Sequence, residues 1–123
     1  MDIYPTLVDF SGMKVPGDLE GTSFPPLLTE PEHEWKKAAF CQVLMPAKPK
    51  DKMGRSLRTE RWHYIEWNDG ADGVQLYDAL NDPREYANLA HDAQRADVVR
   101  ELAAKIKVGW KQAAPVSAKT MSE

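Results

Sequence analysis

The sequence predicts an α+β domain, in which an antiparallel sheet of about four strands is packed by one long helix. Short runs rich in β-branched and aromatic residues follow one another through the middle of the chain, separated by brief turn signals. Beyond them, apolar residues recur at three- and four-residue intervals, which is typical of a helix lying on a sheet. The expected strands cover about 39–45, 55–60, 62–67 and 74–80, and the expected helices cover about 2–11 and 92–112.

The first expected element is the short N-terminal helix. Asp2 suits its N-cap, Pro5 its first turn, and Gly12 the left-handed position that ends a helix. Its apolar stripe consists of Ile3, Leu7, Val8 and Phe10. Residues 13–34 are rich in proline and glycine and predict an irregular loop with a brief helical turn near residues 27–28.

Turn signals separate the expected strands. The charged, proline-broken loop 46–52 follows the first strand, and we expect it to be mobile, together with a disordered tail at 114–123. The pair Glu60-Arg61 predicts a tight turn between the second and third strands. The run Asn-Asp-Gly-Ala-Asp-Gly at 68–73 is the sharpest turn signal and leads into the last strand.

The long C-terminal helix has Asp92 as its candidate N-cap. Its apolar stripe consists of Ala96, Val99, Leu102, Ala103, Ile106 and Trp110. Glu101 and Lys105 form a favourable i,i+4 pair on the outer side. We therefore expect an N-terminal helix and linker at 1–37 and an α+β subdomain at 38–113.

Composition excludes several classes of function. The 123 residues suffice for one compact core, and the net charge of −3 leaves no basic face for nucleic acid. No apolar run approaches the ~20 residues that span a bilayer, so we expect neither a nucleic-acid nor a membrane partner. Cys41 is the single cysteine, which excludes an intrachain disulfide. No export signal is visible at the N-terminus, and the localisation stays open.

Three stretches in order resemble the C-terminal end of type I sulfatases. Residues 2–7 with 19–28 are similar to the segment that closes the large α/β domain of these enzymes. Residues 53–64 resemble the strand-turn-strand of their smaller C-terminal subdomain, and residues 76–90 resemble its last strand and the turn into the final helix. The middle stretch, which ends in Glu66-Trp67, is most similar to the iduronate-2-sulfatase branch.

The resemblance implies a subdomain that is non-catalytic by itself. In the family, the nucleophile is a formylglycine made from a Cys-x-Pro-Ser-Arg motif, whereas Cys41 is followed by Gln-Val-Leu-Met. The family's calcium or magnesium is held by aspartates and an Asp/Asn pair that precede the matched region. We therefore expect no catalytic residue, metal ligand or cofactor in this chain. Its implied role is to brace a sulfatase catalytic domain, which is its expected partner if encoded separately, and to help shape a sulfated-sugar pocket. Parent sulfatases are often exported.

Arg58, Trp62 and His63 are the candidate substrate-binding residues. An arginine can clamp a sulfate or a uronate carboxylate, although a structural ion pair is the more ordinary role. A hydrogen-bonded or solvent-facing His63 is favoured over a metal ligand, because the three histidines share no ligand spacing. Strand alternation puts Trp62 and Tyr64 on one face and Trp67 on the other, which favours core packing over a sugar platform.

Two alternatives stay open at this point. The chain can instead be an independent module that binds a sulfated or acidic saccharide through Arg58, Arg61 and the aromatic residues. We also expect a homo-oligomer, because the apolar stripe of the N-terminal helix and one sheet face lose their cover outside a whole sulfatase. The opposing possibility is that this helix folds back onto its own sheet.

The first prediction is that the purified chain hydrolyses no sulfate ester, because it lacks the family's nucleophile and metal ligands. The measurement is metal-dependent release of sulfate from a chromogenic aryl sulfate or a sulfated sugar, with heat-denatured protein as the control. Activity above that control would overturn the prediction.

Overall fold

The computed structural model describes residues 1–109, which form two compact units. The first unit is Met1–Trp35, and the second begins at Lys36. The first contains the helices α1 (Ile3–Phe10) and α2 (Pro25–Thr29). The second contains the strands β1 (Ala39–Met45), β2 (Lys52–Arg58), β3 (Trp62–Trp67) and β4 (Val74–Asp78), followed by the 3-10 turn η1 (Ala93–Arg95) and α3 (Ala96–Val108).

The first unit is held together by hydrogen bonds between α1 and the loop that follows it. Asp2 Oδ1 accepts from the backbone N–H of Thr22 at 3.0 Å, and the Thr6 hydroxyl oxygen accepts from that of Phe24 at 3.1 Å. Gly21 passes so close to Met1 that a Cβ would lie 2.3 Å from the Met1 carbonyl oxygen, so only glycine fits there. Gly12 has φ of 70°, which confirms the expected left-handed helix end.

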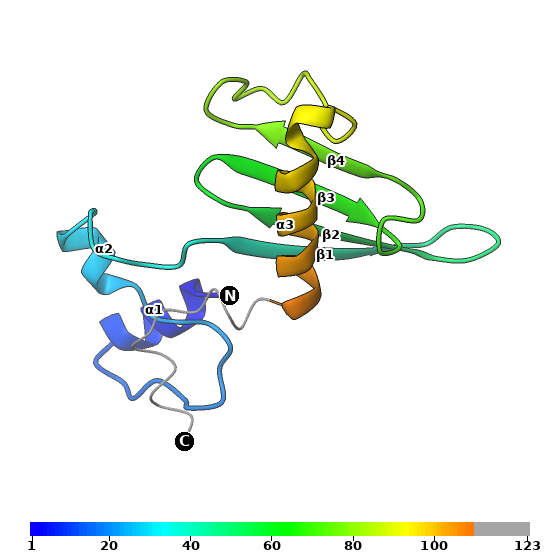
Figure 1. Ribbon diagram of the computed structural model, residues 1–123. Coiled ribbons are helices and arrows are strands. Elements are labelled where there is room, and N and C mark those ends of the chain that lie inside the picture. Colours follow the sequence, from blue (N-terminus) through cyan, green and yellow to red (C-terminus); the bar gives the residue numbers. More distant parts are fainter. Residues whose placement is uncertain (110–123) are drawn as a thin grey trace. The chain divides into compact units, whose positions relative to one another are not determined.

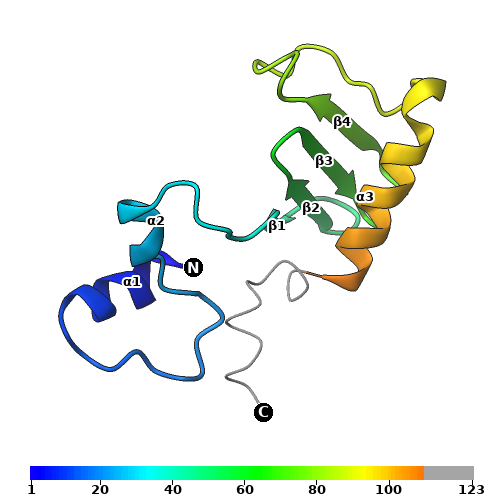
Figure 2. The same ribbon diagram turned by 60° about the vertical axis from the view of Figure 1, so that its left-hand side comes forward.

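The second unit is an antiparallel meander with the strand order β1-β2-β3-β4. The single helix α3 runs across one face of this sheet, as Figures 1 and 2 show from two directions. The expected α+β class, with four antiparallel strands, a C-terminal helix and a short N-terminal helix, is confirmed.

The core lies between α3 and the covered sheet face. Its buried members come from three strands and the helix: Leu57, Tyr64, Leu76, Leu102 and Ile106. Trp62 packs against their edge, so Trp62 and Tyr64 share this face as the alternation predicts. Glu66 is also buried, where its Oε2 accepts from the Tyr64 hydroxyl at 3.2 Å.

Several expected boundaries need correction. β2 spans Lys52–Arg58 rather than 55–60. The β1–β2 hairpin extends beyond the ends of the other strands, and the Met53 backbone N–H donates to Asn68 Oδ1 at 2.9 Å. β4 ends at Asp78 rather than at residue 80, because the Asp78 carboxylate turns the chain by accepting from the backbone N–H groups that follow.

The predicted long helix is shorter than 92–112 within the described residues. Asp92 caps the 3-10 turn η1, where its Oδ1 accepts from Gln94 N at 2.9 Å, and the α-helix proper begins at Ala96. Gly109, with φ of 90°, follows the last helical residue. The expected pair of Glu101 with Lys105 is confirmed at 2.6 Å. Trp110 and the expected tail at 114–123 lie outside the described residues.

The second prediction concerns alkaline unfolding. Burial and the neighbouring Glu66 carboxylate raise the pKa of Tyr64 to about 12. Since this folded-state pKa lies above the ordinary tyrosine value of about 10, the stability from the neutral phenol is complete below pH 10 and is lost as the pH rises towards 12. The loss over this window should be on the order of 2–3 kcal/mol.

Urea unfolding between pH 8 and 12 measures this loss. Tyr64→Phe should flatten the alkaline decline, whereas Tyr86→Phe, at a position that is 79% exposed, should retain it. Equal slopes for the two variants would show that Tyr64 does not carry the effect.

Candidate functional site

The sheet face opposite α3 carries the candidate site. We call it the open face, and its side chains alternate with those of the core along each strand. From the register, it presents Cys41, Val43, Gly54, Ser56, Arg58, His63, Ile65, Trp67 and Tyr77. Trp67 therefore lies on the face opposite to Trp62 and Tyr64, as the alternation predicts.

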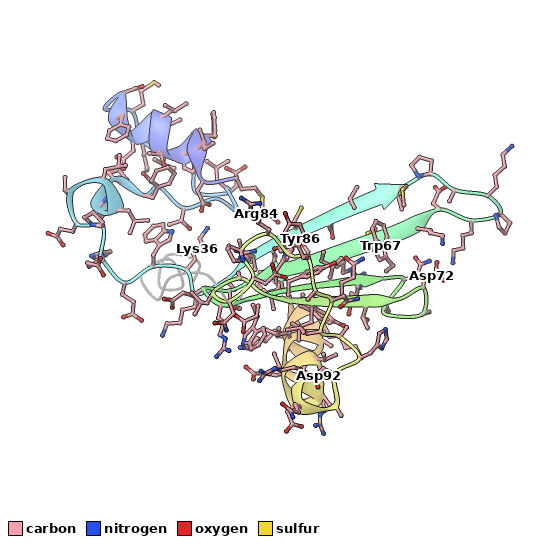
Figure 3. The ribbon with its side chains drawn as sticks, turned by 90° about the horizontal axis from the view of Figure 1, so that it is seen from above. Lys36, Trp67, Asp72, Arg84, Tyr86 and Asp92 are labelled. Atoms are coloured by element: carbon pink, nitrogen blue, oxygen red, sulfur yellow. The ribbon has the colours of Figure 1, made fainter. Side chains whose placement is uncertain are left out.

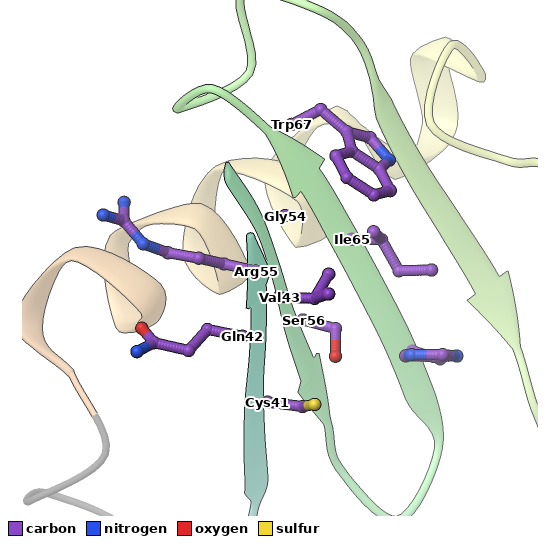
Figure 4. A pocket seen from close by; sticks show the side chains of 9 residues that line it. Cys41, Gln42, Val43, Gly54, Arg55, Ser56, Ile65 and Trp67 are labelled. Atoms are coloured by element: carbon purple, nitrogen blue, oxygen red, sulfur yellow. The ribbon is translucent and has the colours of Figure 1, made fainter. Parts of the chain in front are cut away.

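A shallow hollow of about 170 Å³ lies in the open face, lined mostly by apolar surface. Figure 4 shows it with α3 behind the sheet. The hollow exists because small residues stand in a row between larger ones, and Gly54 is the key position. The Trp67 indole lies over Gly54 so closely that a Cβ there would be 2.8 Å from its ring. The glycine thus lets an aromatic side chain from the neighbouring strand lie flat on the sheet.

A charged cluster occupies one end of the open face. The Arg58 Nη1 donates to Glu85 Oε1 at 2.7 Å, and the His63 Nδ1 lies 2.8 Å from the same carboxylate oxygen. The ring of Tyr77 lies beside His63, with the ring centroids 6.3 Å apart. We call Arg58, His63, Tyr77 and Glu85 the Arg58 corner.

The loop after β4 brings Glu85 to this corner. In Figure 3, α3 lies on one side of the sheet, and Arg84 and Tyr86 lie on the opposite side. Glu85 itself has φ of 57°, a left-handed backbone conformation that is uncommon outside glycine. Such a conformation costs roughly 1–3 kcal/mol and persists only where the surroundings enforce it. Here the hydrogen bond from Glu85 N to Asp82 O, at 3.0 Å, shapes the turn.

The chemistry of the Arg58 corner suits an anion. Arg58 gives one of its five N–H donors to Glu85 and is 45% exposed, so other donors face solvent. A guanidinium held by one carboxylate is pre-ordered to bind a second oxyanion, such as a sulfate or a carboxylate. The Glu85 carboxylate contacts both Arg58 and His63. It offsets part of the positive charge that such an anion would meet.

Trp62 belongs to a different environment on the covered face. The Arg61 and Arg95 guanidinium carbons lie 4.6 and 5.7 Å from its ring centroid. Arg61 also donates to the buried Asp78 carboxylate, at 2.8 Å from Nη2, and this holds the pKa of Asp78 well below its usual range. Of the three candidate residues, Arg58 and His63 therefore come together and Trp62 does not join them.

The sequence did not predict Glu85 as a site residue, and it pointed to Tyr77 only as one member of a possible aromatic platform for sugar rings. The register places Tyr77 opposite His63, so a correct strand alignment suffices to find it. Glu85 lies 27 positions after Arg58 and in a loop, where no periodicity predicts which way a side chain points. The nearby run Asn81-Asp82-Pro83 predicts a turn around Glu85, but it does not predict that Arg58 is its partner.

Among residues 1–109, no three His, Cys, Asp or Glu side chains gather in a way that could hold a metal ion. No helix in the same range is long and apolar enough to cross a membrane.

The third prediction separates the backbone and the carboxylate contributions of Glu85. Glu85→Gln removes the charge and keeps the left-handed backbone, whereas Glu85→Gly removes the charge and relieves the backbone. We expect the glycine variant to be more stable than the glutamine variant by about 1 kcal/mol. The ion pair itself, being partly exposed, should account for about 0–1 kcal/mol. Urea unfolding measures both values, and a glutamine variant more stable than the glycine variant would contradict the assignment.

Known proteins share this arrangement of strands and helix. Residues 1–112 match the family model described as N-sulphoglucosamine sulphohydrolase, C-terminal. The chain is 32% identical to an N-acetylglucosamine-6-O-sulfatase of Bacteroides thetaiotaomicron over 116 residues, which is 91% of this chain and 21% of that protein. It is 36% identical to human arylsulfatase K over 103 residues, which is 73% of this chain and 18% of that protein.

A solved structure is also similar to this chain. A protein in complex with its substrate D-glucosamine-2-N,6-O-disulfate matches 90% of this chain and 23% of its own length, with a TM-score of 0.74 and 32% identity. The chain thus spans about a fifth of the length of the curated relatives described here. Because the family model covers nearly all of it, this chain belongs to the N-sulphoglucosamine sulphohydrolase C-terminal family, and it is a sulfatase C-terminal domain.

Proposed function

We propose that this domain, non-catalytic by itself, braces the catalytic domain of a sulfatase and lends the Arg58 corner to the border of its sulfated-sugar pocket. The observation that carries the proposal is a partly exposed arginine, held in place by Glu85, at the end of the sheet face that carries the apolar hollow. An uncovered hollow suits a protein neighbour, and an arginine at its end suits an acidic substrate.

The outer side of α1 supports the bracing role. Ile3, Leu7 and Phe10 are 67%, 59% and 60% exposed, and they follow one another at helical spacing. Monomeric proteins rarely leave such contiguous apolar surface in water. At about 25 cal/mol per Å² of apolar surface, covering these side chains would contribute several kcal/mol to the binding of a neighbouring domain.

The pocket role rests on the Arg58 corner. A sulfated uronic acid or glucosamine carries sulfate and carboxylate oxyanions, and both bind an arginine fork well. His63 and Tyr77 add a ring and a hydroxyl beside it, which suits the edge of a sugar. In the whole enzyme, the formylglycine and the calcium or magnesium would come from the catalytic domain.

We further propose that the parent enzyme belongs to the iduronate-2-sulfatase branch. The support is the stretch 53–64 with Glu66-Trp67, which now has a structural meaning. The Trp67 indole covers Gly54, so these two residues act as one cross-strand unit.

The fourth prediction tests both roles in a chimera. The C-terminal portion of the Bacteroides N-acetylglucosamine-6-O-sulfatase that matches this chain is replaced by residues 1–112. We expect a folded protein that releases sulfate, because the domain supplies the same bracing surface. In this chimera, Arg58→Ala should raise KM about tenfold with little change in kcat, since the arginine binds the substrate and does not react with it.

Matched variants distinguish the two roles. Leu7→Glu should prevent the replaced domain from packing against the catalytic domain of the chimera. Asp18→Ala, at an exposed loop position, should leave this packing unchanged. An unchanged KM in the Arg58→Ala chimera would exclude the role of Arg58 at the substrate pocket, and the bracing role alone would then stand. If instead the isolated chain binds sulfated disaccharides through Arg58 at micromolar concentration, the independent binding module is the better description.

A further inference from the structure

The outer edge of β1 is unlike the rest of the molecule. The strand Ala-Phe-Cys-Gln-Val-Leu-Met contains no charged residue and no proline. It is the terminal strand of the sheet, so within residues 1–109 no strand pairs with its outer side. Val43, Leu44 and Met45 are 51%, 56% and 44% exposed. Natural sheets usually protect such edges with lysine, proline or a bulge, and β1 has none of these.

The opposite edge of the same sheet is protected. Asn88 and Leu89 run along β4, where Leu76 N donates to Asn88 Oδ1 at 3.0 Å and Leu89 N donates to Leu76 O at 2.8 Å. These bonds occupy the outward main-chain groups of Leu76, at the middle of β4. The sheet can therefore gain a strand at the β1 edge but not at β4, and any assembly through strand addition stops after one step.

We propose that β1 pairs antiparallel with β1 of a second copy of this chain, about a twofold axis at Gln42. In that register, Gln42 faces its own copy, Cys41 faces Val43 of the second copy, and Phe40 faces Leu44 of the second copy. Every apolar side chain thus meets another apolar side chain on the same face of the sheet. The central glutamine amide both donates and accepts, so two copies can bond to each other across the axis.

The absence of charged residues from β1 favours a second copy of β1 as its partner. An uncharged strand meets no repulsion from its own copy, whereas the chain elsewhere carries many charges of both signs. The twofold axis would stand perpendicular to the sheet, giving eight continuous strands with both α3 helices on one side. The two hollows would then lie on the other side as one larger apolar surface. This inference does not depend on the proposed sulfatase role.

The fifth prediction is a dimer that a single charge at the axis abolishes. Light scattering coupled to gel filtration of the full chain at high micromolar concentration should give twice 13.9 kDa. Gln42→Lys places two ammonium groups opposite each other and should give 13.9 kDa, with an unchanged circular dichroism spectrum because position 42 is exposed. Gln42→Thr, the matched uncharged variant, should stay dimeric.

Cysteine crosslinking tests the register independently. In Cys41→Ser/Gln42→Cys, the two new thiols face each other and should form a covalent dimer under mild oxidation. In the control Cys41→Ser/Val43→Cys, they stand about 8 Å apart by strand spacing and rise, beyond the roughly 7 Å that a disulfide spans. This control should crosslink at least tenfold more slowly.

Three results would overturn the proposal. The first is a wild-type mass of 13.9 kDa at high micromolar concentration, as expected if the β1 edge pairs only with the remainder of a sulfatase. The second is a dimer that persists in Gln42→Lys but is lost in Leu7→Glu, which would place the interface on α1. The third is equal crosslinking of the two cysteine variants.

Discussion

One helix covers one face of a four-stranded sheet, and most features of this domain follow from that imbalance. The buried core is small: among the described residues of the sheet, Leu57, Tyr64 and Leu76 are its buried members, and they pack with Leu102 and Ile106 of α3. The strands alternate, so each buried side chain is flanked by neighbours that point to the other face, where no described element of the same unit forms a second layer. Within residues 36–109, no helix takes the place of the second layer of helices that a larger protein would have on that face.

The loop from β4 to α3 partly compensates for that missing layer. It bonds along β4 through Asn88 and Leu89, and it carries Glu85 onto the open face. Holding Glu85 in a left-handed conformation costs free energy, which the contacts with Arg58 and His63 help to offset. One loop therefore protects a sheet edge and orders an arginine that is suited to bind an oxyanion.

The family assignment agrees with this picture of an incompletely covered domain. In its relatives, the region that matches this chain is about a fifth of the whole protein. The exposed apolar side of α1, the hollow beside Trp67 and the unpaired β1 edge that borders this hollow are surfaces of the kind that a neighbour covers. Bracing and substrate contact would then both depend on residues that contribute little to the domain's own core.

Local sequence signals predict the elements of this protein, since turn residues, capping and periodicity act over a few positions. Gly12, the turn at 68–73 and the pair of Glu101 with Lys105 could all be predicted in this way, as could the opposite faces of Trp62 and Trp67. The bounds of β1 and β3 were also predicted correctly, but the start of β2 was not, because Lys52 and Met53 join β2 only through their pairing with β1 and the contact of Met53 with Asn68. The Arg58 corner was also decided by the tertiary structure. Its carboxylate comes from a loop 27 residues away, and where a loop side chain points depends on long-range contacts that no local pattern encodes.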